Sequence, residues 1–345
     1  MALQVTQSDA LEQYCASLRA AGLDAPWSRP GPLVELKKTR VEPYLWRWAD
    51  IEPLLRRGPE FVKPGRGAER RILRLANPGV PERTSTHTIS IAIQYLLPGE
   101  TAPAHRHTPN AIRFMLEGQG AYTTVEGDKC RMAPGDLVLT PSMSWHDHGN
   151  EGTEPVIWLD GLDSPVARYL EILAAEQHTA ERQPTGELAG LSERRFGAAG
   201  LRPAWLSPSA GPSRLIHYRW GSTHAALRRH GELPGSPYDD VMLEYIDPAA
   251  GRSILPTLGC YIQMLRPGVR TRSHRQSSSA VYRVVHGSGE TVIDGVPFEW
   301  RERDFFAIPP LARHEHANGG AEPAILFSVQ DVPLLRALGH YREEE

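Results

Sequence analysis

Cysteine is scarce in this chain of 345 residues: Cys15, Cys130 and Cys260 are the only three, and no two of them have C-x-x-C spacing. This argues against a disulfide or zinc framework and for thiols in a reducing cytoplasm. No apolar run reaches the length of a membrane span, and the first residues lack the basic-then-apolar order of a signal peptide. The formal net charge of −3 gives no indication of nucleic acid or a membrane as a partner.

Glycine and proline are abundant instead, with 31 and 30 residues, which fits many turns between short strands. Branched and smaller or polar residues alternate over residues 89–97, and short apolar runs follow at 137–139 and 156–159. A period of two predicts strands. Residues 9–20, 50–57 and 166–176 have helical composition. The pattern predicts an all-β dominated fold with a few helices.

The second half of the chain repeats the first. Gly99-x5-His105-Arg106-His107 recurs as Gly268-x5-His274-Arg275-Gln276, and Pro141-x4-His146-x3-Asn150 recurs as Pro309-x4-His314-x3-Asn318. Such duplication predicts two copies of one β-barrel. We expect an N-terminal arm over residues 1–80, a metal-binding barrel over 81–165, a linker, helical and then irregular, over 166–235, and a barrel with a degenerate site over 236–345.

Three histidines of the first copy are candidate metal ligands. His105 and His107 are two residues apart, so on a strand they point to the same face, and His146 arrives from a later strand. Three neutral imidazoles leave coordination positions open, as in a catalytic metal site. The second copy has Gln276 at the position of His107, which predicts that it binds metal poorly.

The stretches 103–108, 145–150 and 158–163 resemble the gentisate 1,2-dioxygenase family of the cupin superfamily, which also acts on salicylate, substituted salicylates and 1-hydroxy-2-naphthoate. The resemblance implies a bicupin of two antiparallel, jelly-roll-type β-barrels and one non-haem Fe(II) per chain on His105, His107 and His146. It also implies a cytoplasmic enzyme of aromatic catabolism that is usually a homotetramer, with a small aromatic hydroxy acid and O2 as its partners.

The activity that follows from this resemblance is an extradiol-type ring cleavage. The bond between the carboxylate-bearing and hydroxyl-bearing carbons, C1 and C2, would break, and both atoms of O2 would enter the product. We expect gentisate or a 5-substituted salicylate such as 5-nitrosalicylate as substrate. Two other classes remain open, because cupins host them as well: a non-catalytic bicupin that binds a small molecule, and a metal-dependent isomerase or decarboxylase.

Further side chains are candidates for contact with the substrate. Arg113 shares a strand face with His107 and could pair with the substrate carboxylate. His148 shares a face with His146, and it could either accept the phenol proton or orient a ligand. Ser90 stands where gentisate and salicylate dioxygenases carry a bulky aromatic residue, so we expect a wider pocket. The remaining candidates are Gln94 and Asp160, which match pocket positions of the family, and Arg66, Arg70 and Arg71 in a basic loop.

Overall fold

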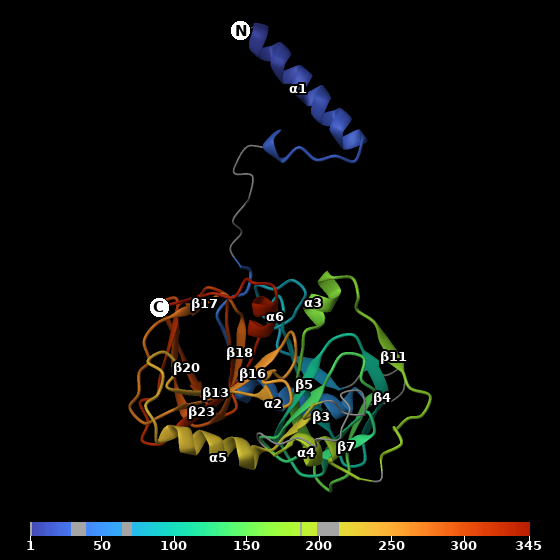
Figure 1. Cartoon of the computed structure of the whole chain (residues 1–345), viewed down its shortest axis with the longest axis vertical. Coiled ribbons are helices and arrows are strands. Elements are labelled where there is room, and N and C mark those ends of the chain that lie inside the picture. Colours follow the sequence, from blue (N-terminus) through green and yellow to red (C-terminus); the bar gives the residue numbers. More distant parts are fainter. Residues whose placement is uncertain (1, 29–38, 64–70, 187, 199–213) are drawn as a thin grey trace. The chain divides into compact units, whose positions relative to one another are not determined.

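The computed structural model describes residues 2–28, 39–63, 71–186, 188–198 and 214–345. The chain divides into two compact units, Met1–Thr39 and Arg40–Glu345. The first unit contains α1 (Ala2–Ala20), which includes the predicted helix at 9–20, and the short helix η1 (Pro26–Ser28). The second unit contains both β-barrels (Figure 1). None of the described helices is both long and apolar enough to cross a membrane.

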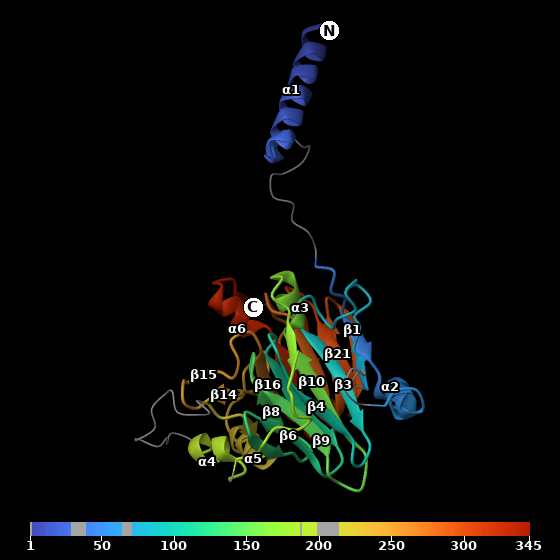
Figure 2. The same cartoon turned by 90° about the vertical axis from the view of Figure 1, so that its right-hand side faces the viewer.

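The first barrel consists of two facing antiparallel sheets. Their orders are β12-β8-β5-β10-β3-β2 and β11-β4-β9-β6-β7. Figure 2 looks onto this barrel. Its strands are β2 (Ile72–Arg74), β3 (Ser90–Leu96), β4 (Thr101–His107), β5 (Ala111–Glu117), β6 (Ala121–Val125), β7 (Asp128–Arg131), β8 (Leu137–Thr140), β9 (His146–Asn150), β10 (Val156–Leu162), β11 (Ala175–Gln177) and β12 (His217–Tyr218). The strands predicted at 89–97, 137–139 and 156–159 are confirmed as β3, β8 and β10.

The second barrel has the order β1-β21-β18-β23-β16-β13 in one sheet and β20-β19-β22 in the other, with two small ribbons, β14-β15 and β17-β24. The chain is therefore a bicupin dominated by β-structure, as predicted. The strands are β1 (Tyr44–Trp46), β13 (Val241–Glu244), β14 (Ile246–Asp247), β15 (Arg252–Ser253), β16 (Gly259–Leu265), β17 (Arg275–Gln276), β18 (Ala280–His286), β19 (Ser288–Ile293), β20 (Val296–Arg301), β21 (Phe305–Ile308), β22 (His314–Ala317), β23 (Ala324–Gln330) and β24 (Glu343–Glu344).

The segments before and between the barrels also supply strands. β1 pairs with β21 of the second barrel, and β2 pairs with β3 of the first, so residues 40–80 add a strand to each barrel. From the linker, β12 joins β8 of the first barrel. The helices are α2 (Trp48–Arg57), η2 (Gly58–Glu60), α3 (Ser164–Tyr169), α4 (Leu191–Phe196), α5 (Trp220–Gly231) and α6 (Val332–Ala337). The predicted helix at 50–57 lies within α2.

One apolar core runs through both barrels. It includes buried side chains of β3, β5, β8 and β10 together with side chains of β16, β18, β21 and β23. Phe114 of β5 and Phe327 of β23 stack face to face, with ring centroids 4.1 Å apart. Burying large apolar side chains typically contributes about 1.5–3 kcal/mol each. The second barrel therefore supports the sheet that carries Arg113 and backs the site of the first.

The segment after β10 differs from the sequence-based expectation. Helical composition predicts a helix over residues 166–176, but α3 ends at Tyr169 and residues 175–177 form β11. Glu171 has a φ of 58°, a left-handed conformation that a helix does not continue through. β11 then pairs with β4, with Ala175 opposite His107 and Gln177 opposite His105. The open edge of the histidine strand thus gains a partner, which overrides local helix propensity.

Candidate metal centre and active site

Neighbouring strands of the first barrel bring four histidines together. His105 and His107 lie on β4, and His146 and His148 lie on β9, with His105 directly opposite His146. The ring of His146 lies 4.1 Å from that of His105 and 4.8 Å from that of His107, measured between centroids. The ring of His148 lies 5.4 Å from that of His146. All four side chains are buried.

Three of these rings share one feature, a hydrogen bond from Nδ1 to a backbone carbonyl. Nδ1 lies 2.7 Å from the Pro103 oxygen in His105, 2.8 Å from the Pro109 oxygen in His107, and 2.8 Å from the Ser144 oxygen in His146. Because a carbonyl oxygen only accepts, Nδ1 carries the proton and Nε2 carries the lone pair in each neutral ring. Metal-binding histidines are typically oriented by such a bond from the other ring nitrogen.

His148 is held differently. Nη1 of Arg113 lies 2.5 Å from its Nδ1, and Nη2 lies 3.3 Å from its Nε2. Arg113 also donates to Oδ1 of Asp160 at 2.8 Å and to the hydroxyl of Thr123 at 2.7 Å. Burial lowers the pKa of Arg113 from its usual value, and the charge of Asp160 opposes that change. His148 therefore belongs to a buried chain of polar groups in which Asp160 matches the charge of Arg113.

Two sets of three histidines could hold a metal ion. Ring nitrogens of His105, His146 and His148 lie within 4.8 Å of one another. His105, His107 and His146, the set predicted from the sequence, share the carbonyl hydrogen bonds. The two sets differ only in His107 and His148. The contact between Arg113 and His148 is unfavourable for a ligand, because a guanidinium competes with the metal for a ring lone pair. Hydrogen-bonding geometry thus favours the predicted set, and the donor chemistry of either set fits a divalent metal such as Fe(II).

A cavity of about 440 Å³ opens beside two of these histidines, His107 and His146, whereas His105 and His148 are not among its lining residues. This volume suits a small organic ligand. Its lining includes His107, His146, Arg113, Asp160, Ser90 and Ala92. Predicted substrate-binding residues from three strands, β3, β5 and β10, therefore lie on one wall of this cavity.

Other predicted side chains lie elsewhere. Gln94 is fully buried on β3, is not among the cavity-lining residues, and its amide finds no hydrogen-bond partner among the described residues. Arg71 is not a lining residue either: it pairs with Glu100 and donates to the Tyr95 carbonyl oxygen at 3.1 Å. These bonds give Arg71 a structural role, because they tie it to β3 and to the turn that follows β3. Arg66 and Arg70 lie outside the described residues.

The cavity also has lining residues that sequence reasoning missed. Arg74 lines it from β2 and Arg168 from α3, and both side chains are exposed. β2 is only three residues long, and its pairing with β3 spans an intervening loop. No local sequence pattern indicates such a register, so the sequence alone gave no signal for either arginine.

The equivalent site of the second barrel has two of the three predicted ligand positions as histidine. The rings of His274 and His314 lie 4.4 Å apart, and His314 Nδ1 lies 3.1 Å from the Ala312 carbonyl oxygen. Burial lowers the pKa of His314 to about 4. Gln276 accepts a hydrogen bond from Ser278 at 3.1 Å through its side-chain oxygen. The described residues of this barrel contain no cluster of three metal-binding side chains.

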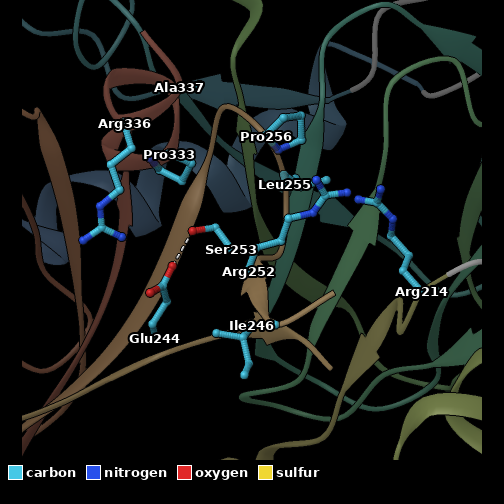
Figure 3. Close-up of a pocket in the computed structure, with 11 residues that line it drawn as sticks. Arg214, Glu244, Ile246, Arg252, Ser253, Leu255, Pro256, Pro333, Arg336 and Ala337 are labelled. Carbon is cyan, nitrogen blue, oxygen red and sulfur yellow. Dashed lines mark hydrogen bonds between the residues drawn. The ribbon is translucent and has the colours of Figure 1, made fainter. Parts of the chain in front are cut away.

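A separate cavity of about 510 Å³ lies between β13, β15 and α6 (Figure 3). Arg214, Arg252 and Arg336 line it, and Glu244 accepts a hydrogen bond from Ser253 inside it. Neither histidine cluster lines this cavity, so it lacks the metal-binding groups of the first barrel.

Comparison with known proteins identifies the family. The cupin domain model matches residues 92–161 and 261–330, one match in each barrel. The chain is 40% identical to a 5-aminosalicylate 1,2-dioxygenase of Comamonas sp over 98% of this chain and 90% of that protein. It is 36% identical to a gentisate 1,2-dioxygenase of Streptomyces sp, over 97% and 95% of the two chains.

The structure gives the same answer. The salicylate 1,2-dioxygenase of Pseudaminobacter salicylatoxidans superposes with a TM-score of 0.87 at 32% sequence identity, over 97% of each chain. The duplicated barrels, the histidine cluster and these similarities agree, and the resemblance inferred from the motifs is confirmed. The chain is an enzyme of the gentisate and salicylate 1,2-dioxygenase family of ring-cleaving bicupins.

Proposed function

We propose that this enzyme is an Fe(II)-dependent dioxygenase that cleaves the C1–C2 bond of a salicylate-type substrate and incorporates both atoms of O2. The observation that carries the proposal is the set of three buried imidazoles whose Nδ1 atoms are each fixed by a backbone carbonyl, beside a cavity. The bond lies between a carboxylate-bearing and a hydroxyl-bearing carbon, so "extradiol-type" describes the reaction only loosely.

His105, His107 and His146 would hold one Fe(II) per chain. When bound, the iron supplies a dipositive centre that a 2-hydroxybenzoate can chelate through its carboxylate and phenolate, and that allows electrons to pass from the ring to O2. Since all three ligands are neutral, the protein leaves the metal's charge available to an anionic substrate. The protein's own contribution is to bind, orient and deprotonate that substrate.

His148 is proposed to accept the phenol proton. Because a neutral imidazole has a single lone pair, the ring would exchange its contact with the Arg113 guanidinium for one with the phenol when it accepts the proton. Asp160 holds Arg113 in place through Nε at 2.8 Å. Arg113 also lines the cavity and could contact the substrate carboxylate, although Asp160 already matches its charge. Its main role would then be to position His148.

The substrate is proposed to be a 5-substituted salicylate or gentisate. Ser90 and Ala92 are both small, and they leave room on one side of the cavity. The relative from Comamonas sp acts on 5-aminosalicylate, and that from Streptomyces sp acts on gentisate; both compounds carry a substituent at position 5 of the ring. Gln94, a buried amide without a described partner, would bind the carboxylate only if the cavity extended to it when substrate binds, because it is not a lining residue here.

We also propose a homotetramer working in the cytoplasm. Exposed apolar side chains follow one another around α3, as expected of a surface buried in an assembly: Tyr169, Leu170, Ile172 and Leu173. The three cysteines are buried and unpaired, which suits a reducing compartment. Light scattering after size-exclusion chromatography tests the assembly, and a monomer would contradict it.

The activity is tested by oxygen uptake of Fe(II)-loaded protein with gentisate, salicylate, 5-aminosalicylate and 5-nitrosalicylate, together with the ultraviolet absorbance of the ring-opened product. We expect equal molar consumption of O2 and substrate. Substrate loss without O2 consumption would indicate an isomerase or decarboxylase, and binding without substrate loss would indicate a non-catalytic bicupin.

A further inference from the structure

Two arginines on the cavity wall have no role in the function proposed above. Arg74 and Arg168 both line the cavity and both are exposed, so they lie at its open end, whereas Arg113 is buried at its inner end. Within the described part of the chain, neither side chain has an ion-pair or hydrogen-bond partner. Among the described residues that line the cavity, Asp160 alone is acidic, and it pairs with Arg113. The open end therefore carries two positive charges without a matching anion.

Strand register places Arg74 beside the space that the small side chains leave. Arg74 of β2 is directly opposite Ala92 of β3. Opposite residues of an antiparallel pair project to the same face, and the diagonal neighbour two residues along lies about 7–8 Å away. That diagonal neighbour is Ser90, which lines the same cavity. An arginine side chain is long enough to reach a group that fills the space beside Ser90.

Arg168 approaches the same end from the other side. Leu162, the last residue of β10, is directly opposite Ser90. α3 begins two residues later at Ser164, and Ser164 and Arg168 both line the cavity. A spacing of four residues puts them on one face of the helix. β2 and α3 thus present one guanidinium each to the part of the cavity next to Ser90.

From this arrangement we propose that Arg74 and Arg168 form a subsite for an oxyanion carried by the substrate ring. The inference rests on the proposed function, in which the carboxylate and phenolate of the salicylate are directed to the histidines. A group across the ring then points to the open end. Guanidinium groups recognise planar oxyanions through paired hydrogen bonds. The preferred substrate class is a salicylate with a second acidic group, such as a 5-carboxylate, rather than one with a hydroxyl or amino group.

The test compares 5-carboxysalicylate with 5-nitrosalicylate, which has the same shape without the charge, and with gentisate. In the Fe(II)-loaded wild type we expect kcat/KM to be highest for 5-carboxysalicylate. In Arg74→Gln and Arg168→Gln, kcat/KM for 5-carboxysalicylate should fall about ten-fold, the usual effect of losing a charge-assisted hydrogen bond, with little change for gentisate. Arg131→Gln is the matched control, because Arg131 is an exposed arginine that pairs with Glu151 away from the cavity.

Two results would overturn the subsite. One is an equal loss of kcat/KM for all three compounds in the Arg74 and Arg168 variants, which would mean general attraction of anions. The other is an unchanged kcat/KM for 5-carboxysalicylate in a variant that carries both Arg74→Gln and Arg168→Gln. Anaerobic calorimetry with 5-carboxysalicylate gives the same comparison without turnover. If the wild type cleaves no compound but binds 5-carboxysalicylate through Arg74 and Arg168, the proposed function fails and the subsite stands; if those variants bind it as the wild type does, the subsite fails.

Discussion

Arg113 and His148 form one buried unit in which Nη1 of the guanidinium lies 2.5 Å from Nδ1 of the imidazole. Two strands of different sheets, β5 and β9, meet in this contact. This contact distinguishes His148 from the other three histidines, whose Nδ1 atoms are hydrogen-bonded to backbone carbonyls. Four buried histidines therefore divide into three candidate ligands and one ring that is held for another purpose.

The first prediction concerns which histidines bind the metal. His107→Ala should reduce iron content to less than about one tenth of the wild-type value, because a three-ligand site loses a ligand. His148→Ala should keep its iron. Elemental analysis of purified protein measures both, and circular dichroism checks the fold.

The second barrel supplies the control for this experiment. His274→Ala should leave the iron content at one per chain, because Gln276 stands in place of a third imidazole. Full iron in the His107 variant, with loss of iron in the His148 variant, would instead support the set of His105, His146 and His148.

A second prediction separates proton transfer from positioning at His148. A glutamine can accept a hydrogen bond from Arg113 but cannot take up a proton. If His148 is the base, His148→Gln and His148→Ala should both lose about 10²–10⁴-fold in kcat while retaining iron. Steady-state kinetics with gentisate measure this loss. A glutamine variant with nearly wild-type kcat would show that the ring only holds Arg113.

The third prediction tests the wall at Ser90. Ser90→Trp should fill the space next to Ala92 and shift preference toward rings with smaller substituents. Discrimination from one side chain in a pocket is typically about 10- to 200-fold, so in this variant the ratio of kcat/KM for 5-nitrosalicylate to that for salicylate should decrease by a factor in this range. Ser90→Ala is the matched control and should keep the wild-type ratio. An unchanged ratio in the tryptophan variant would place the substituent elsewhere.

The fourth prediction is a pH dependence of stability. Burial alone would raise the pKa of Asp136, but hydrogen bonds from His217 and from the backbone of Trp220 and Ala133 lower it below its usual value. The His217 bond is 2.9 Å long. Since the folded-state pKa is depressed, this stabilisation is present above the unfolded pKa of about 3.9 and is lost as the pH falls through the folded-state value.

Asp136→Asn should therefore lower the free energy of unfolding by about 1–3 kcal/mol at pH 7. The difference from wild type should shrink below a pH of about 4, where the carboxyl of the unfolded wild type is protonated. Urea unfolding at several pH values measures this difference. A destabilisation that is equal at pH 7 and at the lowest pH would mean that the carboxylate charge does not contribute.

The sequence was sufficient for the features that depend on local pattern or repetition. The period of two at residues 89–97 predicted β3, and the H-x-H spacing predicted that His105 and His107 share a face. Duplication of the glycine, proline and histidine spacings predicted two barrels. Each of these predictions follows from side-chain alternation along a strand or from the internal repeat of the sequence, and none of them requires knowledge of distant contacts.

Features that depend on non-local pairing were not predictable. Residues 175–177 form β11 because β4 has an open edge, although their composition favours a helix. Arg71 reads as part of a basic loop, but Glu100, far along the chain, pairs with it. Arg74 enters the cavity only because β2 pairs with β3 in one register. In each case a contact with a distant segment decides the position, and single-sequence patterns do not contain it.

The most direct test of the central claim is the fate of O2. Fe(II)-loaded enzyme is supplied with gentisate under ¹⁸O₂, and the ring-opened product is analysed by mass spectrometry immediately after quenching. We predict a product that contains two labelled oxygen atoms and retains the substrate carboxylate. A product without label, or one that has lost the carboxylate, would contradict ring cleavage by a dioxygenase.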